Sequence, residues 1–444
     1  MKIKTLGIAL VSMILLMLNA CKKDTMEAVD LLKTVPANAD AVVVVNLEGV
    51  LNDLGCKIEE GRIEAGPELM KLINKSSRDE RQAILSIFDG DAGIDTKLAV
   101  VFYDKGSWYF TVALQDPEKF KDFTEKDFGS KFKDGGNGIE TLDIVAMKGA
   151  QAWFLLGEDN EQISAKKIEP YTKIEVSASY LVTDMGQKLL VDESDLRGCG
   201  RIESLLRMAL DPGERGMVTM VAQMVFDDAD ALYFTLNFKE SLMEMDGTVL
   251  NEKGKPAEYN LNDDKLDIKA LENIGGECDV LMALSVDEDL IEEFADLAET
   301  FGEPEIGLVL NAFSNLDGTV GIAVGDVYTA SDAFAGVITA KGGLSFLAKG
   351  IIKEMANTVR ESGENIYLYN GTVRGSLSVS EGARMLDGAC MGVVADGSDI
   401  DTRGVPDMDK VMLKVCPDGE GINIKLNIFF KDKENSLLTI IRNS

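Results

Sequence analysis

The sequence of 444 residues contains no histidine. This absence excludes Ser-His-Asp and Cys-His nucleophile systems, histidine general bases and zinc sites of the H-E-x-x-H type. The sequence also lacks a Walker A loop, a G-x-G-x-x-G fingerprint and a G-x-S-x-G elbow. Any catalysis would therefore depend on carboxylates, lysine, tyrosine or cysteine.

Cysteine is scarce and follows no ligand pattern. Six cysteines are present, of which Cys21 lies near the N-terminus and the others are Cys56, Cys199, Cys278, Cys390 and Cys416. No two of them form C-x-x-C, so the spacing predicts neither a disulfide framework nor a zinc site. Cys278 and Cys390 lie in apolar runs and are predicted to be small buried core residues. Whether any pair is bridged is left open by the sequence.

Basic residues are few relative to acidic ones. The chain has 45 Lys and Arg against 76 Asp and Glu, a formal net charge of −31. Such a field repels the phosphates of nucleic acids and anionic lipid surfaces, and we expect no nucleic-acid partner. The simpler interpretation of the acidity is solubility of an extracytoplasmic protein; the alternative is an acidic surface for a cation or a basic partner.

The N-terminus carries a targeting signal. Lys2 and Lys4 precede an uncharged run, Leu6 to Leu18, which is shorter than the ~20 residues that span a bilayer and fits the apolar region of a signal peptide. The run ends in Leu18-Asn19-Ala20-Cys21, which resembles the lipobox of bacterial lipoproteins. The resemblance implies a signal peptide over residues 1–20, lipidation of Cys21, and a lipid-anchored location in the cell envelope, at the outer membrane.

The remaining chain is predicted to be a tether followed by two related halves. Residues 21–38 form the tether, 39–250 the first half, 251–276 a linker and 277–444 the second half. Asn46 and Ser285 each follow an apolar strand run and precede an apolar helix pattern, as a helix N-cap does. Hairpins mixed with helices favour the α+β class, with each half a mostly antiparallel sheet covered by helices.

Later elements can be matched between the halves at a spacing of about 220 to 240 residues, as a duplication predicts. The first half has a hairpin, a helix, a second strand pair and a closing strand pair, namely 97–103 with 108–114, 117–126, 139–147 with 152–156, and 231–238 with 243–250. The second half has the corresponding predicted series 319–324 with 335–339, 344–360, 366–369 with 373–379, and 422–430 with 437–441.

The start of the body is similar to a known group. Val35-Pro36-Ala37-Asn38-Ala39-Asp40, followed by an apolar strand and preceded by the lipobox, resembles the large Bacteroides-type lipoproteins catalogued as a domain of unknown function. The resemblance implies no known activity. In such bacteria a lysine-plus-acidic cluster after the lipidated cysteine accompanies surface export, and Lys22-Lys23-Asp24 supplies only one acid, which favours the periplasmic face. Asp24-Thr25-Met26 is similar to their O-glycosylation acceptor, which makes Thr25 a candidate glycosylation site.

Two acidic loops and one cysteine are the remaining candidates for chemistry. The segment 89–95 has oxygens at calcium-loop positions 1, 3 and 7 but lacks the glycine and the glutamate that complete such a loop, so a turn is predicted there. The segment 396–401 is interpreted in the same way, and we expect no metal and no cofactor. Cys199 lies between two glycines and near Arg197 and Arg201, where it is either a reactive thiol or part of a tight turn before a helix at 202–210; without histidine, the turn is favoured.

These observations predict a non-enzymatic, membrane-anchored lipoprotein with a binding or scaffolding role. Its expected partners are the membrane, through the lipid on Cys21, and an envelope protein or glycan. The alternative is a carboxylate-dependent hydrolase acting on glycans, for which Trp108 and Trp153 are the available aromatic platforms, although both are predicted to pack within strands. Two facing carboxyls ~5–10 Å apart beside an aromatic would favour the hydrolase. A broad apolar groove or an exposed sheet edge would favour partner binding.

Overall fold

The computed structural model describes residues 28–59, 62–75, 78–156, 162–209, 225–226, 228–300, 304–325, 333–397, 408–419 and 421–443. Its helices are α2 (Ala28–Leu32), α3 (Leu47–Asp53), α4 (Pro67–Ile73), α5 (Arg78–Phe88), α6 (Pro117–Phe128), α7 (Ala165–Ile168), α8 (Asp184–Val191), α9 (Ile202–Ala209), α11 (Ile268–Glu272), α12 (Glu288–Thr300), α13 (Pro304–Ala312), α14 (Phe346–Met355), α15 (Val379–Met385) and α16 (Ser436–Asn443).

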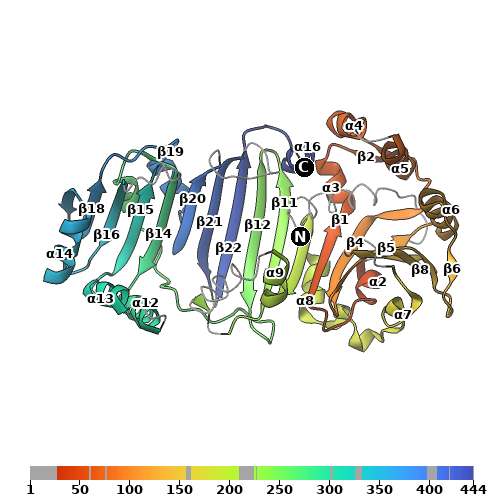
Figure 1. Cartoon of the computed structure of the whole chain (residues 1–444), viewed down its shortest axis with the longest axis horizontal. Coiled ribbons are helices and arrows are strands. Elements are labelled where there is room, and N and C mark those ends of the chain that lie inside the picture. Colours follow the sequence, from red (N-terminus) through yellow and green to blue (C-terminus); the bar gives the residue numbers. More distant parts are fainter. Residues whose placement is uncertain are drawn as a thin grey trace.

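One sheet of 18 strands runs along the molecule (Figure 1). Its members are β1 (Ala41–Asn46), β4 (Ile94–Asp104), β5 (Ser107–Leu114), β6 (Lys133–Asp134), β7 (Glu140–Leu142), β8 (Val145–Lys148), β9 (Gln151–Leu156), β10 (Leu196–Arg201), β11 (Ala231–Lys239), β12 (Leu242–Leu250), β14 (Val280–Val286), β15 (Gly318–Val324), β16 (Phe334–Thr339), β17 (Thr358–Ser362), β18 (Asn365–Asn370), β20 (Met391–Asp396), β21 (Met408–Asp418) and β22 (Gly421–Phe430). Short pairs β2 (Lys57–Glu59) with β3 (Arg62–Glu64) and β13 (Glu277–Cys278) with β19 (Leu377–Ser378) stand apart.

The strands lie in the order β6-β7-β8-β9-β5-β4-β1-β10-β11-β12-β22-β21-β20-β14-β15-β16-β18-β17, and every neighbouring pair is antiparallel. The predicted α+β class with a mostly antiparallel sheet is therefore confirmed. The last strand of the first half, β12, pairs with the last strand of the second half, β22. The chain thus forms one continuous sheet across the predicted linker.

Helices cover both faces of the sheet towards its two ends. In the first half, residues of α3, α4 and α5 build one core on one face, and residues of α2 and α8 build another around Trp153 on the opposite face. In the second half, α12 and α14 cover one face, and α11 and α15 cover the other. Figure 1 shows these helices gathered at the right and left of the view, with the long strands β11, β12, β21 and β22 between them.

The folded body begins earlier than the predicted boundary at residue 39. Leu31 and Leu32 of α2, together with Val35, are fully buried in the core that contains Trp153. The polar composition of the segment before α2 predicted a tether, but these three apolar side chains have a core to fill. From residue 28 onwards the predicted tether is thus part of the body.

The predicted linker 251–276 also contributes to a core. Leu266, Ala270, Leu271 and Ile274 are buried against the second half of the sheet. The Asp267 side chain accepts a hydrogen bond from the backbone N–H of Ala270 and so caps α11 at its N-terminus. A short, capped helix with apolar residues on one face is easily missed among the surrounding lysines and aspartates.

Three second-half elements differ from the prediction. The helix predicted over 344–360 ends at Met355, because Thr358–Ser362 forms strand β17 and pairs with β18. The segment 437–441 is helical instead of being a closing strand, since the Asn435 side chain accepts from the Leu437 backbone N–H at the start of α16. The strand that forms a hairpin with β22 is β21, which was not predicted. Residues 373–379, predicted to be a strand, contain only the short β19 before α15 begins.

Candidate functional site

The two modification sites predicted from the sequence, Cys21 and Thr25, lie outside the described residues. Lipidation and glycosylation there remain predictions. Among the helices that the structure describes, none is both long enough and apolar enough to cross a bilayer.

The described part of the two acidic loops assembles no metal site. Asp89 and Asp91 are turn residues after α5, whereas Asp95 lies in β4 and is buried, with its Oδ1 accepting from the Lys97 backbone N–H. Burial raises the pKa of the Asp95 carboxyl. Nowhere in the described residues do three potential metal-ligating side chains come together. Of the second loop, only Asp396 and Gly397 are described.

Cys199 lies in a central strand, so the predicted turn is wrong. It faces Val42 of β1 on one side and Tyr233 of β11 on the other. Burial raises the pKa of its thiol, although a hydrogen bond with Tyr180 and the nearby ammonium of Lys188 act in the opposite direction. The Lys188 ammonium lies 3.7 Å from the centre of the Tyr233 ring. A buried thiol that stays protonated is a poor nucleophile. All five body cysteines are free, and Cys278 and Cys390 are fully buried, as predicted.

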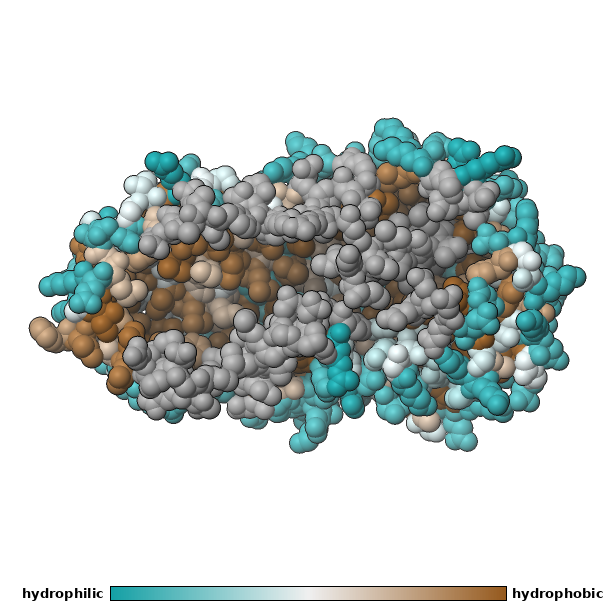
Figure 2. Space-filling model, viewed as in Figure 1, coloured by the Kyte–Doolittle hydropathy of each residue, from teal (hydrophilic) through white to brown (hydrophobic). Residues whose placement is uncertain are grey.

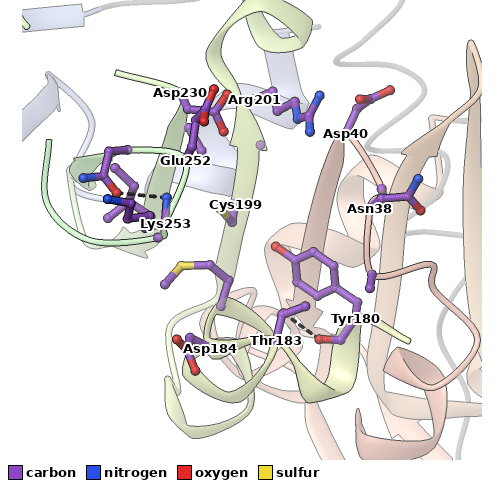
Figure 3. A pocket seen from close by; sticks show the side chains of 18 residues that line it. Asn38, Asp40, Tyr180, Thr183, Asp184, Cys199, Arg201, Asp230, Glu252 and Lys253 are labelled. Carbon is purple, nitrogen blue, oxygen red and sulfur yellow. Dashed lines mark hydrogen bonds between the residues drawn. The ribbon is translucent and has the colours of Figure 1, made fainter. Parts of the chain in front are cut away.

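An open pocket of about 260 Å³ lies at the end of β10. Its lining comes from the segments 37–40, 180–185, 199–201, 230–231 and 250–254. Figure 3 shows the Tyr180 side chain and Cys199 on one side of the pocket, with Arg201, Asp40 and Asp230 around the other. The side chains at the mouth are charged and of both signs, which suits a small polar molecule. Burial raises the pKa of the Cys199 thiol in its lining, which disfavours the thiolate form.

A pair of carboxyls joins the first-half helices to the middle of the sheet. Burial, together with the charge of Asp195 and a hydrogen bond to it, raises the pKa of Asp53 to about 7. Asp53 ends α3, whereas Asp195 immediately precedes β10 and accepts a hydrogen bond of 2.7 Å from the Phe238 backbone N–H. Two carboxyls in direct hydrogen bond are closer than the ~5 Å or more that separates glycosidase pairs. The pair therefore gives no support to the glycan hydrolase alternative.

The middle of the sheet has one continuous apolar row. Directly opposed residues run from strand to strand in the order Leu236, Met245, Leu426, Leu413, Val393, Met282 and Ile322, crossing β11, β12, β22, β21, β20, β14 and β15. Because opposed residues in a sheet share a face, all seven side chains lie on the same side. At about 4.8 Å per strand the row is roughly 29 Å long.

This apolar row is only partly covered. Met282 and Leu413 are 39% and 38% exposed, and the other five members are half-buried. Six of the seven, all except Leu236, belong to no hydrophobic cluster formed by the described residues. Figure 2 shows brown surface to the left of the centre of the view. An apolar surface of this extent is an interaction site more often than a structural accident.

On the reverse side, β14, β15 and β20 contribute Leu281, Ala323 and Val394 to a buried core, whereas β11, β12 and β22 are mostly polar. Opposite the apolar row, this face carries Thr235, Asn237, Glu244, Asp246, Thr248, Asn423, Lys425 and Asn427. The Lys425 ammonium lies 3.3 Å from a carboxylate oxygen of Asp246. The contrast follows from the alternation in Met243–Gly247 and Ile422–Ile428, which could be read from the sequence. An open apolar face was not predicted, because helices were expected to cover the sheet.

Comparisons with known proteins give no functional lead. No family model matches the chain, and no curated protein matches it. Solved structures of TP0453 align weakly. Its crystal form IV has a TM-score of 0.31 at 11% identity, over 50% of this chain and 80% of that one. Crystal form I has a TM-score of 0.28 at 10% identity, over 82% and 97% of the respective chains.

Proposed function

We propose that this protein is a lipid-anchored binding protein of the cell envelope, without enzymatic activity, whose apolar row binds aliphatic chains. The observation that carries the proposal is the row itself: seven opposed apolar side chains across seven strands, of which six pack in no described core. Removal of such surface from water is favourable by about 25 cal/mol per Å² of apolar area.

The chemistry of the row favours an aliphatic occupant over a sugar or a peptide strand. Its members are Leu, Ile, Val and Met, which offer neither a hydrogen-bond donor nor an aromatic platform. All seven strands are interior and paired on both sides, so a peptide cannot add as a further strand there. The row is about 29 Å long, and one leaflet's acyl chain is roughly 15 Å. It can therefore hold two chains end to end.

The two halves are proposed to derive from duplication. The strand series β8-β9-β5-β4-β1-β10-β11-β12 has the same pairing order as β17-β18-β16-β15-β14-β20-β21-β22. Aligning the two series by their strand pairing matches Asn46 with Ser285, as expected from the sequence, and Leu242 with Gly421. The number of residues between matched positions therefore decreases along the chain. Each half would then contribute one side of the row, on either side of the β12–β22 seam.

The anchor and location are proposed on the lipobox alone. Cys21 would carry the acyl chains and hold the body at the outer membrane, on its periplasmic face, and Thr25 would carry a glycan. Replacing Cys21 with Ala should move the protein from the membrane fraction to the soluble fraction. Sedimentation of the variant with membranes, at the wild-type level, would contradict the anchor.

The binding proposal is tested with a neutral fluorescent probe, N-phenyl-1-naphthylamine, which brightens in apolar sites. We expect the wild-type protein to enhance its emission and palmitate to displace it. Leu413→Lys should weaken probe binding about tenfold or more, since it places an ammonium in the middle of the row. The matched control is Asn427→Lys, on the polar face of the neighbouring strand. Equal binding by Leu413→Lys and the wild type would overturn the proposal.

A further inference from the structure

A second apolar surface lies at the end of the molecule that carries α14. Phe346 and Leu347, the first two residues of α14, are 96% and 61% exposed, and Leu308 of α13 is 65% exposed. Val309, Met355 and Val359 are also exposed. Helices α13 and α14 contact each other, so these side chains gather at one tip, which Figure 2 shows as brown atoms at the far left. We call this set the distal tip.

Folding does not require this arrangement. Ser345 already caps α14 by accepting from the Ala348 backbone N–H at 3.0 Å, and Ala348 and Ile352 supply the buried face of the helix. Phe346 therefore contributes almost no buried area to the protein. A fully exposed phenylalanine beside an exposed leucine is costly in water unless something covers both.

On helix α14, basic residues outnumber acidic ones, unlike in the chain as a whole. Lys349 and Lys353 lie one and two turns after Phe346 on α14, are exposed, and form no ion pair among the residues described. Glu354 is the only acidic residue of the helix. At physiological ionic strength a charge is screened beyond about 8 Å, so the distant acids of the body do not cancel these two lysines.

We infer that the distal tip inserts into the interface of a lipid bilayer that contains anionic lipid. Phe and Leu side chains at a helix start, with lysines on the adjoining turns, match the pattern of interfacial helices, whose apolar residues enter the boundary between headgroups and acyl chains. The tip protrudes from the end of the molecule (Figure 2), as insertion into a bilayer needs. A lipid headgroup layer supplies anionic groups for the two lysines, with an apolar layer beneath it for Phe346 and Leu347.

A bilayer contact at the distal tip would also orient the whole molecule. Helix α14 and helix α2, where the described chain begins after the predicted anchor, lie towards opposite ends of the molecule (Figure 1). A protein held at both places would lie with its long axis along one bilayer or bridge two.

The test uses the lipidated full-length protein reconstituted with vesicles of phosphatidylcholine and about one-third phosphatidylglycerol. Phe346→Trp places a reporter in the tip, and Val191→Trp is the matched control, since Val191 is 79% exposed in the other half. Brominated phospholipids should quench the emission of Trp at position 346 by roughly half, given insertion of ~5–10 Å. They should leave the Val191→Trp emission unchanged. Adding Lys349→Glu and Lys353→Glu should reverse most of the quenching at position 346.

The contrary outcomes are distinct. Emission from position 346 that matches the Val191→Trp control in vesicles would overturn the inference, as would failure of the protein to float with vesicles at all. A blue shift that grows with protein concentration but is insensitive to brominated lipid would identify a second copy as the occupant, and would also overturn it. Loss of probe binding at the apolar row in the preceding experiment would not affect this result.

Discussion

The two ends of the sheet and its middle are built differently. Towards the ends, helices cover both faces of the sheet, and the strand β1 is almost entirely buried. In the middle, β12 and β22 have one polar face and one apolar face, and the central residues of the apolar face, Met245 and Leu426, belong to no described cluster. A strand buried on both faces stabilises the fold, whereas a strand apolar on one open face stabilises a complex. The difference therefore separates the residues that fold this protein from those that we propose bind its ligand.

The largest effect is expected for a substitution in the core at one end of the sheet. Leu51 of α3 is fully buried in the first-half core, and Leu51→Ala should lower the free energy of unfolding by about 3 kcal/mol through the cavity it leaves. Leu413→Ala, the same change in the apolar row, should cost less than about 1 kcal/mol because Leu413 is already exposed in part. Urea unfolding measures both. Equal losses for the two variants would mean that the row is part of the folding core.

A smaller effect concerns the packing of one ring beside the row. A Cβ atom on Gly198 of β10 would lie 2.6 Å from the Phe234 ring and 3.1 Å from the Val42 carbonyl oxygen. Gly198→Ala must displace the ring, which should cost about 1–2 kcal/mol and disturb probe binding. Phe234→Leu combined with Gly198→Ala is the matched control, because the shorter side chain relieves the clash. If the single variant unfolds at the wild-type urea concentration, the ring is free to move and this close packing does not constrain the row.

The pH dependence of stability tests the carboxyl pair that links an end of the sheet to its middle. The folded-state pKa of Asp53, about 7, lies above the unfolded value near 3.9, so folding favours the protonated form. Stability from this group is present at low pH and is lost as the pH rises from about 4 through 7. Asp53→Asn should flatten the fall and raise the melting temperature at pH 8 by about 1–3 °C, with little change at pH 4. An unchanged pH profile in the variant would mean that protonation of Asp53 does not cause the dependence of stability on pH.

The smallest effect is expected at the seam between the halves. Asp246 and Lys425 oppose each other on the polar face, and both are more than a third exposed, so their pairing is worth under about 1 kcal/mol. Asp246→Lys should destabilise by a few tenths of a kcal/mol, and the exchanged pair Asp246→Lys with Lys425→Asp should recover it. A double-mutant cycle that shows no coupling would mean that this ion pair does not stabilise the contact between β12 and β22.

Much of the fold follows from local pattern. The apolar run 41–45 is rich in β-branched valine and predicts a buried strand, and Asn46 caps α3 as expected by accepting from the Gly49 backbone N–H. Ser285 was expected to cap α12 in the same way, but Asp287 does so, because β14 continues for one more residue. A one-residue difference in strand length is set by pairing with β15, which no local pattern encodes.

The candidate site was only half predictable. Alternation in β12 and β22 gives one apolar face, and the sequence contains it plainly. What covers that face depends on where the helices fall, and α3, α12 and α14 fall towards the ends of the sheet. The carboxyl pair of Asp53 and Asp195 likewise joins residues far apart in sequence, and only the antiparallel pairing of β1 with β10 brings them together.

The most direct test of the central claim is photo-crosslinking of the native protein with a diazirine fatty acid, followed by peptide mapping. We expect the crosslinks to fall on β12, β21 and β22, at the residues of the apolar row, and to decrease about tenfold in Leu413→Lys while persisting in Asn427→Lys. Crosslinks confined to the distal tip, or absent from all three strands, would contradict the proposal that the middle of this sheet binds aliphatic chains.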